Sequence, residues 1–270
     1  MDTDGILGLM QETAEKVITP RFRALEEKDI SHKSGPYDLV TIADKEAEDY
    51  LTTRLRAAFP DALVVGEEAV FDAPDLRNLL PNADHAFIID PIDGTNNFVR
   101  GRDEHGVMVA ETMGGVTTRG WIWQPQTGRA YVAERGAGVR LNGEPIVRPS
   151  VDRLPLGASS KEAMNGFTAD GHLAPVVWSQ FACAFDYPAV LHGDIDFMFY
   201  TSMHPWDHLA GSLMVTENGG VSRTMDGLAY TVLSRSRGLL VACDTLVWMT
   251  AQQRWPAAIK GPAGQIFKAN

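Results

Sequence analysis

The chain has 270 residues, of which 44% are hydrophobic and 22% charged, the balance of an ordinary globular protein long enough to bury a sizeable core. Its formal net charge of −11 argues against general affinity for nucleic acid or for an anionic membrane. No apolar run approaches the ~20 residues that span a bilayer, the first residues lack an apolar signal core, and Cys183 and Cys243 form no metal or redox motif. We therefore expect a cytoplasmic protein without nucleic-acid or membrane partners.

The first part of the chain has the periodicity of amphipathic helices. Apolar residues recur on one helical face over residues 4–27 and again over residues 44–59. Thr41 is the expected N-cap of the second helix, with Asp44 three residues further on. Between the helices, residues 31–36 are polar and contain glycine and proline, which predicts a loop.

Two carboxylates follow an apolar run in the next part of the chain. Residues 86–89 are predicted to form a buried strand, and Asp90 and Asp93 lie just past its end. Residues 86–99 contain no lysine or arginine, so packing these two anions together is costly unless a cation binds. Oxygen ligands suit Mg²⁺, Mn²⁺ or Ca²⁺. Gly94 and Thr95 then predict a tight turn whose N–H groups face an anion, so the pattern indicates a metal-dependent phosphoryl site.

The alternative interpretation of the same residues is a simple turn. Aspartate, proline and glycine are ordinary turn formers, and Asp93 or Thr95 is able to cap a helix. An EF-hand fits poorly, because Pro91 and Ile92 interrupt its alternating ligands and no glutamate closes the loop.

The remaining elements are expected in a definite order. After residue 105 the pattern is that of an antiparallel meander, and near residues 149–155 it changes to alternating strands and helices. The predicted strands are residues 62–66, 107–110, 120–123, 129–133, 138–141, 196–200 and 238–242, and the later helices are residues 207–218 and 244–258, the last capped by Asp244.

Several blocks resemble the inositol monophosphatase superfamily of Mg²⁺-dependent, lithium-sensitive phosphatases. The matching residues are Gly66-Glu67-Glu68, Asp90 through Phe98, Trp206-Asp207 with Ala210-Gly211, and the segment 33–41 with Asp44. Their order and spacing agree over nearly the whole chain. The resemblance implies an α+β / α/β fold, the layered α-β-α-β-α sandwich of the inositol monophosphatase/fructose-1,6-bisphosphatase type. The implied fold divides into an α+β domain of residues 1–150 and an α/β domain of residues 151–270, with the active site between them.

The same resemblance implies the metal ligands. Glu67, Asp90 and the backbone carbonyl of Ile92 would hold one metal, and Asp90, Asp93 and Asp207 a second. The expected ions are two or three Mg²⁺, with Mn²⁺ as an alternative and Ca²⁺ or Li⁺ as inhibitors. Asp207 also fits the N-cap of its helix.

Catalytic roles follow from the resemblance too. Asp44, Glu67 and Thr95 are the expected catalytic residues, with Thr95 orienting the attacking water and Asp44 hydrogen-bonded to it. The amides of Gly94 and Thr95 would bind phosphate. Lys33 matches a lysine in a loop near the metals. On its own, Asp44 would be interpreted as a first-turn helix acid.

Neighbouring residues carry weaker assignments. Glu68 is expected behind the metal ligands or at the surface, and Trp206 as a packing residue. The histidines His105, His204 and His208 are expected to be structural, because the implied mechanism uses metal-activated water. Arg100 and Arg102 fit either a substrate contact or a subunit surface.

The substrate-facing residues depart from inositol-specific members. Those members place a glutamate seven residues before the Trp-Asp aspartate, where this chain has Tyr200, and their Gly-Ser/Thr-Ala turn corresponds to residues 181–183. The expected substrate contacts are Asp93, Cys183, Tyr200 and Asp207. Losing a carboxylate that accepts bonds from hydroxyls changes specificity strongly.

These residues predict a Mg²⁺-dependent phosphomonoesterase acting on a small phosphorylated metabolite, and the resemblance implies a homodimer. The alternatives left open are a sugar or nucleotide bisphosphate phosphatase, a histidinol-phosphate phosphatase, and a non-catalytic homologue that binds a phospholigand.

Overall fold

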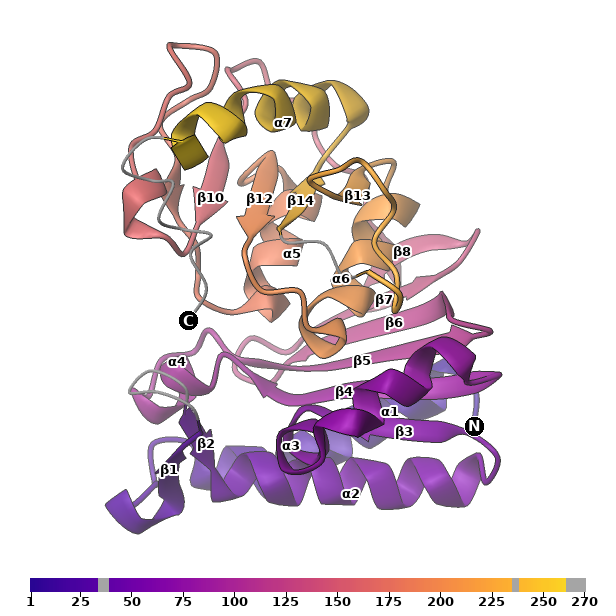
Figure 1. The fold of residues 1–270 in the computed structure, drawn as a ribbon. Helices are drawn as coiled ribbons and strands as arrows, with labels where there is room; N and C mark the ends of the chain where they lie inside the picture. Colours follow the sequence, from indigo (N-terminus) through magenta and orange to yellow (C-terminus); the bar gives the residue numbers. More distant parts are fainter. Residues whose placement is uncertain (34–38, 235–237, 261–270) are drawn as a thin grey trace.

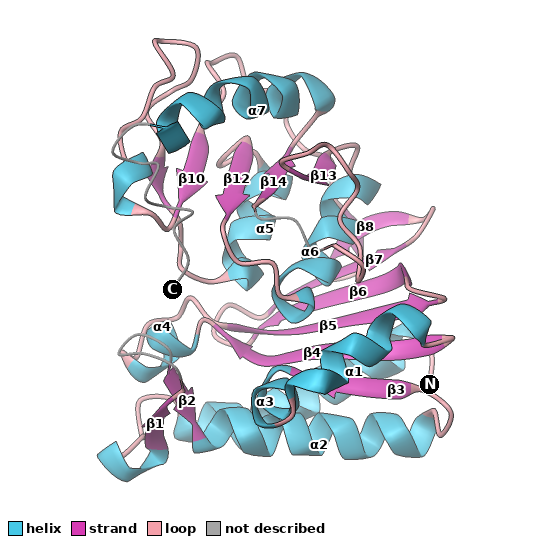
Figure 2. Cartoon of the chain, in the orientation of Figure 1, coloured by secondary structure: helices cyan, strands magenta, loops and turns pink. Residues whose placement is uncertain are grey.

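A computed structural model describes residues 1–33, 39–234 and 238–260, with side chains as far as residue 254. Helical and sheet layers alternate through the molecule, from α1 and α2, through a seven-stranded sheet, α5 and α6, and a five-stranded sheet, to α7 (Figures 1 and 2). The predicted α-β-α-β-α sandwich is confirmed. The bounds of these helices are α1 Thr3–Thr13, α2 Ile42–Ala58, α5 Cys183–His192, α6 Pro205–Glu217 and α7 Thr245–Lys260.

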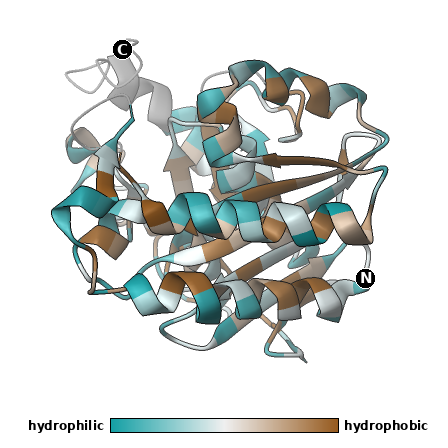
Figure 3. Ribbon diagram, turned by 90° about the horizontal axis from the view of Figure 1, so that it is seen from below, coloured by the Kyte–Doolittle hydropathy of each residue, from teal (hydrophilic) through white to brown (hydrophobic). Residues whose placement is uncertain are grey.

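The outer helices α1 and α2 cover one face of the larger sheet. Figure 3 views the molecule from their side, and hydrophilic and hydrophobic segments alternate along both helices. Thr41 caps α2 as predicted, with its side chain accepting from the Ala43 N–H. The single helix predicted over residues 4–27 is wrong, because α1 gives way to a π turn (Ala14–Ile18) and a 3-10 turn (Thr19–Arg21). Pro20 lacks an N–H donor there, so an α-helical ladder cannot continue.

The larger sheet has the strand order β3-β4-β5-β6-β7-β8-β9. β3 and β4 are parallel, and each later strand pairs antiparallel with its predecessor, as the predicted meander requires. The bounds are β3 Leu63–Gly66, β4 His85–Asp93, β5 Gly106–Met113, β6 Val116–Gln124, β7 Arg129–Glu134, β8 Gly138–Leu141 and β9 Glu144–Pro145.

Strand β4 is buried on both faces and carries the acidic motif. Phe87 and Ile89 join the core shared with α1 and α2, whereas Ile88 joins the core shared with α5 and α6. The expectation that the strand ends at residue 89 is wrong, because β4 continues to Asp93. A bulge between Asp90 and Asp93 shifts the register against β5, so that Asp90 pairs with Met108 and Asp93 with Gly106.

The smaller sheet has the order β11-β10-β12-β14-β13. Phe197 and Phe199 of β12 pack under α7, whereas Met198 and Tyr200 face the layer of α5 and α6. This alternation places Tyr200 on the side of the acidic motif. The bounds are β10 Gly157–Ser159, β11 Val177–Trp178, β12 Phe197–Tyr200, β13 Val221–Thr224 and β14 Leu239–Ala242.

Other boundaries differ from those predicted. Part of the loop expected over residues 31–36 belongs to the hairpin of β1 (Ile30–His32) and β2 (Leu39–Thr41), and residues 34–36 lie outside the described chain. α6 begins at Pro205 with His204 as its N-cap residue, so Asp207 lies in the first turn and is not the cap. Asp244 does cap α7, since its Oδ1 accepts from the Val247 N–H at 2.7 Å.

Several elements were not predicted, including α3 (Glu67–Asp72), α4 (Thr95–Val99), α5 and the short strands β10, β11 and β13. The proposed domain boundary at residue 150 falls in the segment between β9 and β10. Within the described ranges, no helix is long and apolar enough to cross a membrane.

Candidate active site

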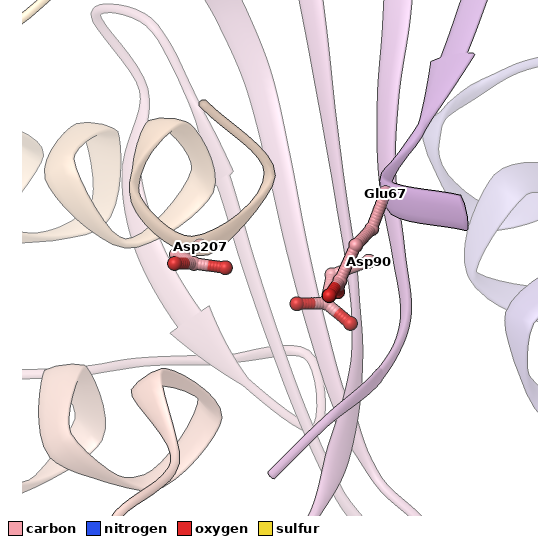
Figure 4. Close-up of side chains that lie close together, drawn as sticks. All are labelled: Glu67, Asp90 and Asp207. Atoms are coloured by element: carbon pink, nitrogen blue, oxygen red, sulfur yellow. The ribbon is translucent and has the colours of Figure 1, made fainter. Parts of the chain in front are cut away.

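Three carboxylates from different elements meet between the larger sheet and α6. Glu67 begins α3 directly after β3, Asp90 lies on β4, and Asp207 lies in the first turn of α6. One carboxylate oxygen from each lies within 4.8 Å of the other two (Figure 4). The sequence therefore predicted this cluster correctly although its members lie up to 140 positions apart (207 − 67).

The buried charge of this cluster favours a bound cation. Asp90 Oδ1 is buried and has no hydrogen-bond partner within the described residues. Burial, and then the charges of Glu67, Asp93 and Asp207, raise the pKa of Asp90 well above its ordinary value. Hard divalent cations take carboxylate oxygens of this kind as ligands, so the residues present fit such an ion.

Lys33 lies closer to this cluster than its place in a loop suggested. Its Nζ donates to Glu67 Oε1 at 2.7 Å and to Glu68 Oε1 at 2.6 Å. Glu68 is buried, so its expected place at the surface is wrong, and burial raises its pKa to about 8. Asp90 and Asp93 have no basic neighbour in sequence, but Glu67 has one in space.

Asp93 lies on the α5 side of the same site. Its Oδ2 accepts a hydrogen bond from the Ala184 N–H at 2.7 Å, so the start of α5 holds this carboxylate in place. Burial raises the pKa of Asp93 to about 7 in spite of that bond. Asp93 lines the same cleft as the three clustered acids, although it is not one of the group that shares the 4.8 Å spacing.

Thr95 connects the acidic turn to helix α2. Its Oγ1 donates to Asp44 Oδ1 at 3.2 Å and to the Ile92 carbonyl at 3.1 Å. Asp44 Oδ2 accepts from the Thr41 N–H at 2.7 Å and from the Thr41 hydroxyl at 2.6 Å. Burial raises the pKa of Asp44 to about 6, and these bonds oppose that rise. Asp44 is thus both a capping residue and the partner of Thr95, so its two interpretations are compatible.

Gly94 allows the turn to pass close to two neighbouring segments. Its φ of +85° lies in the left-handed region that favours glycine. A Cβ at this position would lie 2.9 Å from Ala182 Cβ and 2.9 Å from the Glu104 carbonyl oxygen. Only glycine therefore fits both the backbone angle and the space.

A cleft of about 650 Å³ opens over these residues. Asp93, Cys183, Tyr200 and Asp207 line it, as expected for substrate contacts. Arg100 and Arg102 also line it, which favours their substrate-side interpretation over a subunit surface remote from the site. Four further lining residues carry no pattern that would select them from the sequence, namely Asn96, Ser160, Lys161 and Ser179.

Tyr200 brings an unusual polar group to the wall of the cleft. Its side chain is buried, and its hydroxyl has no hydrogen-bond partner in the part of the chain that the structure describes. Its ring stacks with Tyr187 at a centroid distance of 5.5 Å and lies 4.6 Å from the His208 ring. The ring is therefore fixed by packing while the hydroxyl is left unsatisfied.

The three histidines expected to be structural, and Trp206, make packing or hydrogen-bond contacts with neighbouring residues. His208 is buried, lies 3.1 Å from the Tyr187 hydroxyl, and burial lowers its pKa to about 3. His105 packs against Phe22 and Phe98, and its Nδ1 lies 3.0 Å from a backbone carbonyl. His204 stacks on the largely buried Trp206 at 4.8 Å.

Glu48 is a positioning residue that the sequence analysis did not select. Its carboxylate accepts from the Glu68 and Ala69 N–H groups, each at 2.8 Å, and so holds the start of α3. A Cβ at Gly66 would lie 2.1 Å from this carboxyl group, so glycine is required before Glu67. The available signal in the sequence was that Glu48 directly follows Ala47, a residue on the apolar face of the predicted helix.

Comparison with known proteins agrees with the fold. The Inositol monophosphatase family matches residues 4–256. Inositol monophosphatase 1 of Solanum lycopersicum is 30% identical over 229 residues, which cover 78% of this chain and 80% of that protein. An IMPase structure from Thermotoga maritima has a TM-score of 0.78 at 24% identity, covering 94% of this chain and 98% of that one.

A solved IMPase/NADP phosphatase complexed with Mg²⁺ and phosphate has a TM-score of 0.74 at 23% identity, covering 92% of this chain and 94% of that one. The layered fold and the carboxylate cleft thus belong to a phosphoric monoester hydrolase. The chain is a member of the inositol monophosphatase family.

Proposed function

We propose that this chain is a Mg²⁺-dependent phosphomonoesterase that hydrolyses a small phosphate ester by direct attack of water, without a covalent enzyme intermediate. The observation that carries the proposal is the buried cluster of Glu67, Asp90 and Asp207, in which Asp90 Oδ1 has no partner among the described residues. Divalent cations bound there would supply neutralisation of the phosphoryl charge and a lowered pKa for the attacking water.

The proposed metal ligands form two overlapping sets. Glu67, Asp90 and the Ile92 carbonyl would hold one cation, and Asp90, Asp93 and Asp207 a second. The clustering of three of these carboxylates and the opening of all five residues onto one cleft support a common metal site. Release of the Lys33 bond to Glu67 would free an oxygen for the first cation.

The chain's own groups position the reactants. The amides of Gly94 and Thr95 would bind phosphate oxygens beside the carboxylates, since both residues line the cleft. The Thr95 hydroxyl would orient the attacking water, and Asp44 would fix that hydroxyl through the 3.2 Å hydrogen bond. Neither role requires a group from outside the described chain.

Specificity would come from the opposite wall of the cleft. Tyr200 and Cys183 lie there, and Tyr200 stands where inositol-specific relatives carry a glutamate. Its phenol cannot accept hydrogen bonds from several inositol hydroxyls as a carboxylate does, so we propose a substrate other than inositol 1-phosphate. A sugar or nucleotide bisphosphate and histidinol phosphate are the alternatives from the family.

Further parts of the proposal concern ions, assembly and location. Mn²⁺ would replace Mg²⁺, whereas Ca²⁺ and Li⁺ would inhibit, with Li⁺ replacing the cation near Asp93 and Asp207. Titration with LiCl against NaCl tests this, because equal effects of the two salts contradict a specific lithium site. We also propose a cytoplasmic homodimer, which sedimentation of the purified protein and localisation in cells would check.

The test of the proposed function is a phosphate-release screen over sugar, nucleotide, amino-alcohol and inositol phosphates with Mg²⁺. We expect turnover of at least one ester, and kcat/KM for inositol 1-phosphate that another ester matches or exceeds. The control is Asp207→Asn, which keeps the size of the side chain and removes a ligand charge. A hundredfold preference for inositol 1-phosphate contradicts the specificity argument, and phosphate binding without turnover of any ester favours the non-catalytic alternative.

A further inference from the structure

Two large aromatic side chains are exposed next to the cleft and stack on each other. Phe181 is 47% exposed and Trp178 is 42% exposed. Their ring centroids lie 5.8 Å apart with an interplanar angle of 29°. An exposed aromatic pair of this kind is costly to hydrate and is therefore a candidate binding surface.

Phe181 lies at the wall of the catalytic cleft, in a backbone conformation that bulky residues rarely adopt. It lines the same cleft as Asp93 and Asp207. Its φ is +57°, and its N–H donates to Ser179 Oγ at 3.0 Å. The surrounding chain therefore holds this ring in place at some conformational cost, a feature that concentrates at functional sites.

Trp178 supports Phe181 from the side of a second cavity. This cavity has a volume of about 360 Å³, and Trp178 and Asp186 contribute to its lining. Asp186 also lines the catalytic cleft, so the two spaces adjoin at this residue. Phe181 thus lines the catalytic cleft, and Trp178, stacked on it, lines the second cavity.

Positive charges accompany the aromatic pair. Arg100 and Lys161 line the cleft, and neither makes an ion pair within residues 1–33, 39–234 and 238–254. Arg102 also lines it and lies 3.1 Å from Glu104. A purely apolar partner surface would gain little from these cations, whereas an anionic small molecule would be attracted by them.

We infer that Phe181, backed by Trp178, is a stacking platform for a planar aromatic ring in the alcohol part of the substrate, which makes nucleoside phosphates the substrate class. The inference rests on the proposed phosphatase function and specifies its substrate. The phosphate would lie at the carboxylates, and the base would lie over Phe181. A cleft of about 650 Å³ is within the range that encloses ligands of this size.

A ring contact far from the bond that breaks has a distinctive kinetic effect. Stacking of a base on an aromatic side chain is sequence-tolerant and is worth about tenfold or more in affinity per base. Because the contact is the same in the ground state and the transition state, its loss raises KM and leaves kcat nearly unchanged.

The test compares adenosine 5′-monophosphate with ribose 5-phosphate, which share the ester and differ in the base. For the wild type we expect kcat/KM to favour the nucleotide by about tenfold or more. Phe181→Ala should remove that preference by raising KM for the nucleotide more than KM for ribose 5-phosphate, and Phe181→Tyr should restore it. Met113→Ala, at an exposed apolar residue outside both cavities, is the matched control and should change neither substrate.

Binding of adenosine, followed by calorimetry in EDTA, gives a readout independent of turnover. We expect binding to the wild type and to Phe181→Tyr, and a loss of about tenfold in Phe181→Ala. Equal kcat/KM values for the two esters in the wild type, or unchanged adenosine binding in Phe181→Ala, overturn the platform. Loss of dimerisation in Phe181→Ala with an intact nucleotide preference assigns the aromatic pair to a subunit contact and also overturns it. Turnover of neither ester nor any other phosphate overturns the proposed function instead, while adenosine binding still decides the platform.

Discussion

Thr95 Oγ1 lies 3.2 Å from Asp44 Oδ1, and the same Asp44 side chain caps helix α2 through Thr41. The buried side chains of Thr41 and Asp44 at the start of α2 therefore fix the hydroxyl proposed to orient the attacking water. Positioning of the water is thus separate from the proposed metal binding, because neither Asp44 nor Thr95 belongs to the cluster of three carboxylates.

Thr95→Ala should reduce kcat by about 10²-fold or more while KM changes little, because the lost hydroxyl acts mainly on the attacking water. Thr95→Ser keeps the hydroxyl and should retain most of the rate, so it is the matched control. Steady-state kinetics at saturating Mg²⁺ provide the measurement. A kcat of the wild-type size in Thr95→Ala would remove the residue from the mechanism.

The carboxylate cluster should destabilise the protein when no cation is bound. Asp90→Asn and Asp207→Asn each remove a carboxyl group whose pKa is raised first by burial and then by neighbouring acids. In EDTA each variant should therefore unfold at a higher temperature than the wild type, by roughly 2–4 °C for each kcal/mol gained. With Mg²⁺ the order should reverse, because the wild type gains more from the ion.

Differential scanning calorimetry with and without Mg²⁺ measures both effects. Asp103→Asn is the control, because Asp103 is exposed and lies outside the cleft. If Mg²⁺ raised the unfolding temperature of wild type and Asp90→Asn by the same amount, Asp90 would not be a metal ligand. Activity plays no part in this test.

Glu67 and Asp90 were predictable as candidate ligands because each comes directly after an apolar run, and the residues that hold the acids in place were not. Carboxylates after an apolar run stand out in sequence, as Glu67 and Asp90 do. The hydrogen bond from Ala184 to Asp93 arises only when α5 packs against the larger sheet at β5 and β6, which no local pattern encodes. The salt bridge of Lys33 to Glu67 is hidden for the same reason.

The layers were predictable to a similar degree. The meander of β5 to β8 has alternating apolar residues and clear turns, so local sequence determines it. Helix α5 was missed because it contains Pro188 and is apolar around most of its circumference, as a helix buried between two sheets must be. Strands of two or three residues, such as β10 and β11, are too short to show a period.

Stability should depend on pH through Asp186, whose pKa burial raises from 3.8 to about 8. Between about pH 4 and pH 8 the folded state keeps this proton, whereas the unfolded state loses it. The contribution of Asp186 to the free energy of unfolding is therefore fully present below about pH 4 and is lost as the pH rises through about 8. Asp186→Asn stays neutral, and its amide oxygen is able to accept the Gln180 N–H as Asp186 Oδ1 does.

We therefore expect the free energy of unfolding of Asp186→Asn, relative to the wild type, to increase between pH 4 and 8 by up to ~1.4 kcal/mol per pH unit. Denaturant titrations in EDTA at several pH values measure this difference. A difference that is independent of pH would show that Asp186 is ionised in the folded protein.

The Tyr200 hydroxyl should lower the stability of the free protein and contribute to binding in the substrate complex. Its hydroxyl is buried and unpartnered among the described residues, so Tyr200→Phe should leave the free energy of unfolding unchanged or raise it by about 1–3 kcal/mol. If the hydroxyl bonds to substrate, kcat/KM should fall by about tenfold at the same time. A destabilised variant with unchanged kcat/KM would contradict both expectations.

The central claim is that bound divalent cations are required for phosphate ester hydrolysis at the cluster of Glu67, Asp90 and Asp207. The most direct measurement is phosphate release from the best ester of the screen by protein treated with EDTA, before and after titration with Mg²⁺, for the wild type and Asp90→Asn. We predict no release in EDTA, full recovery of the wild type on adding Mg²⁺, and little recovery of Asp90→Asn. Full activity of the wild type in metal-free buffer would contradict it.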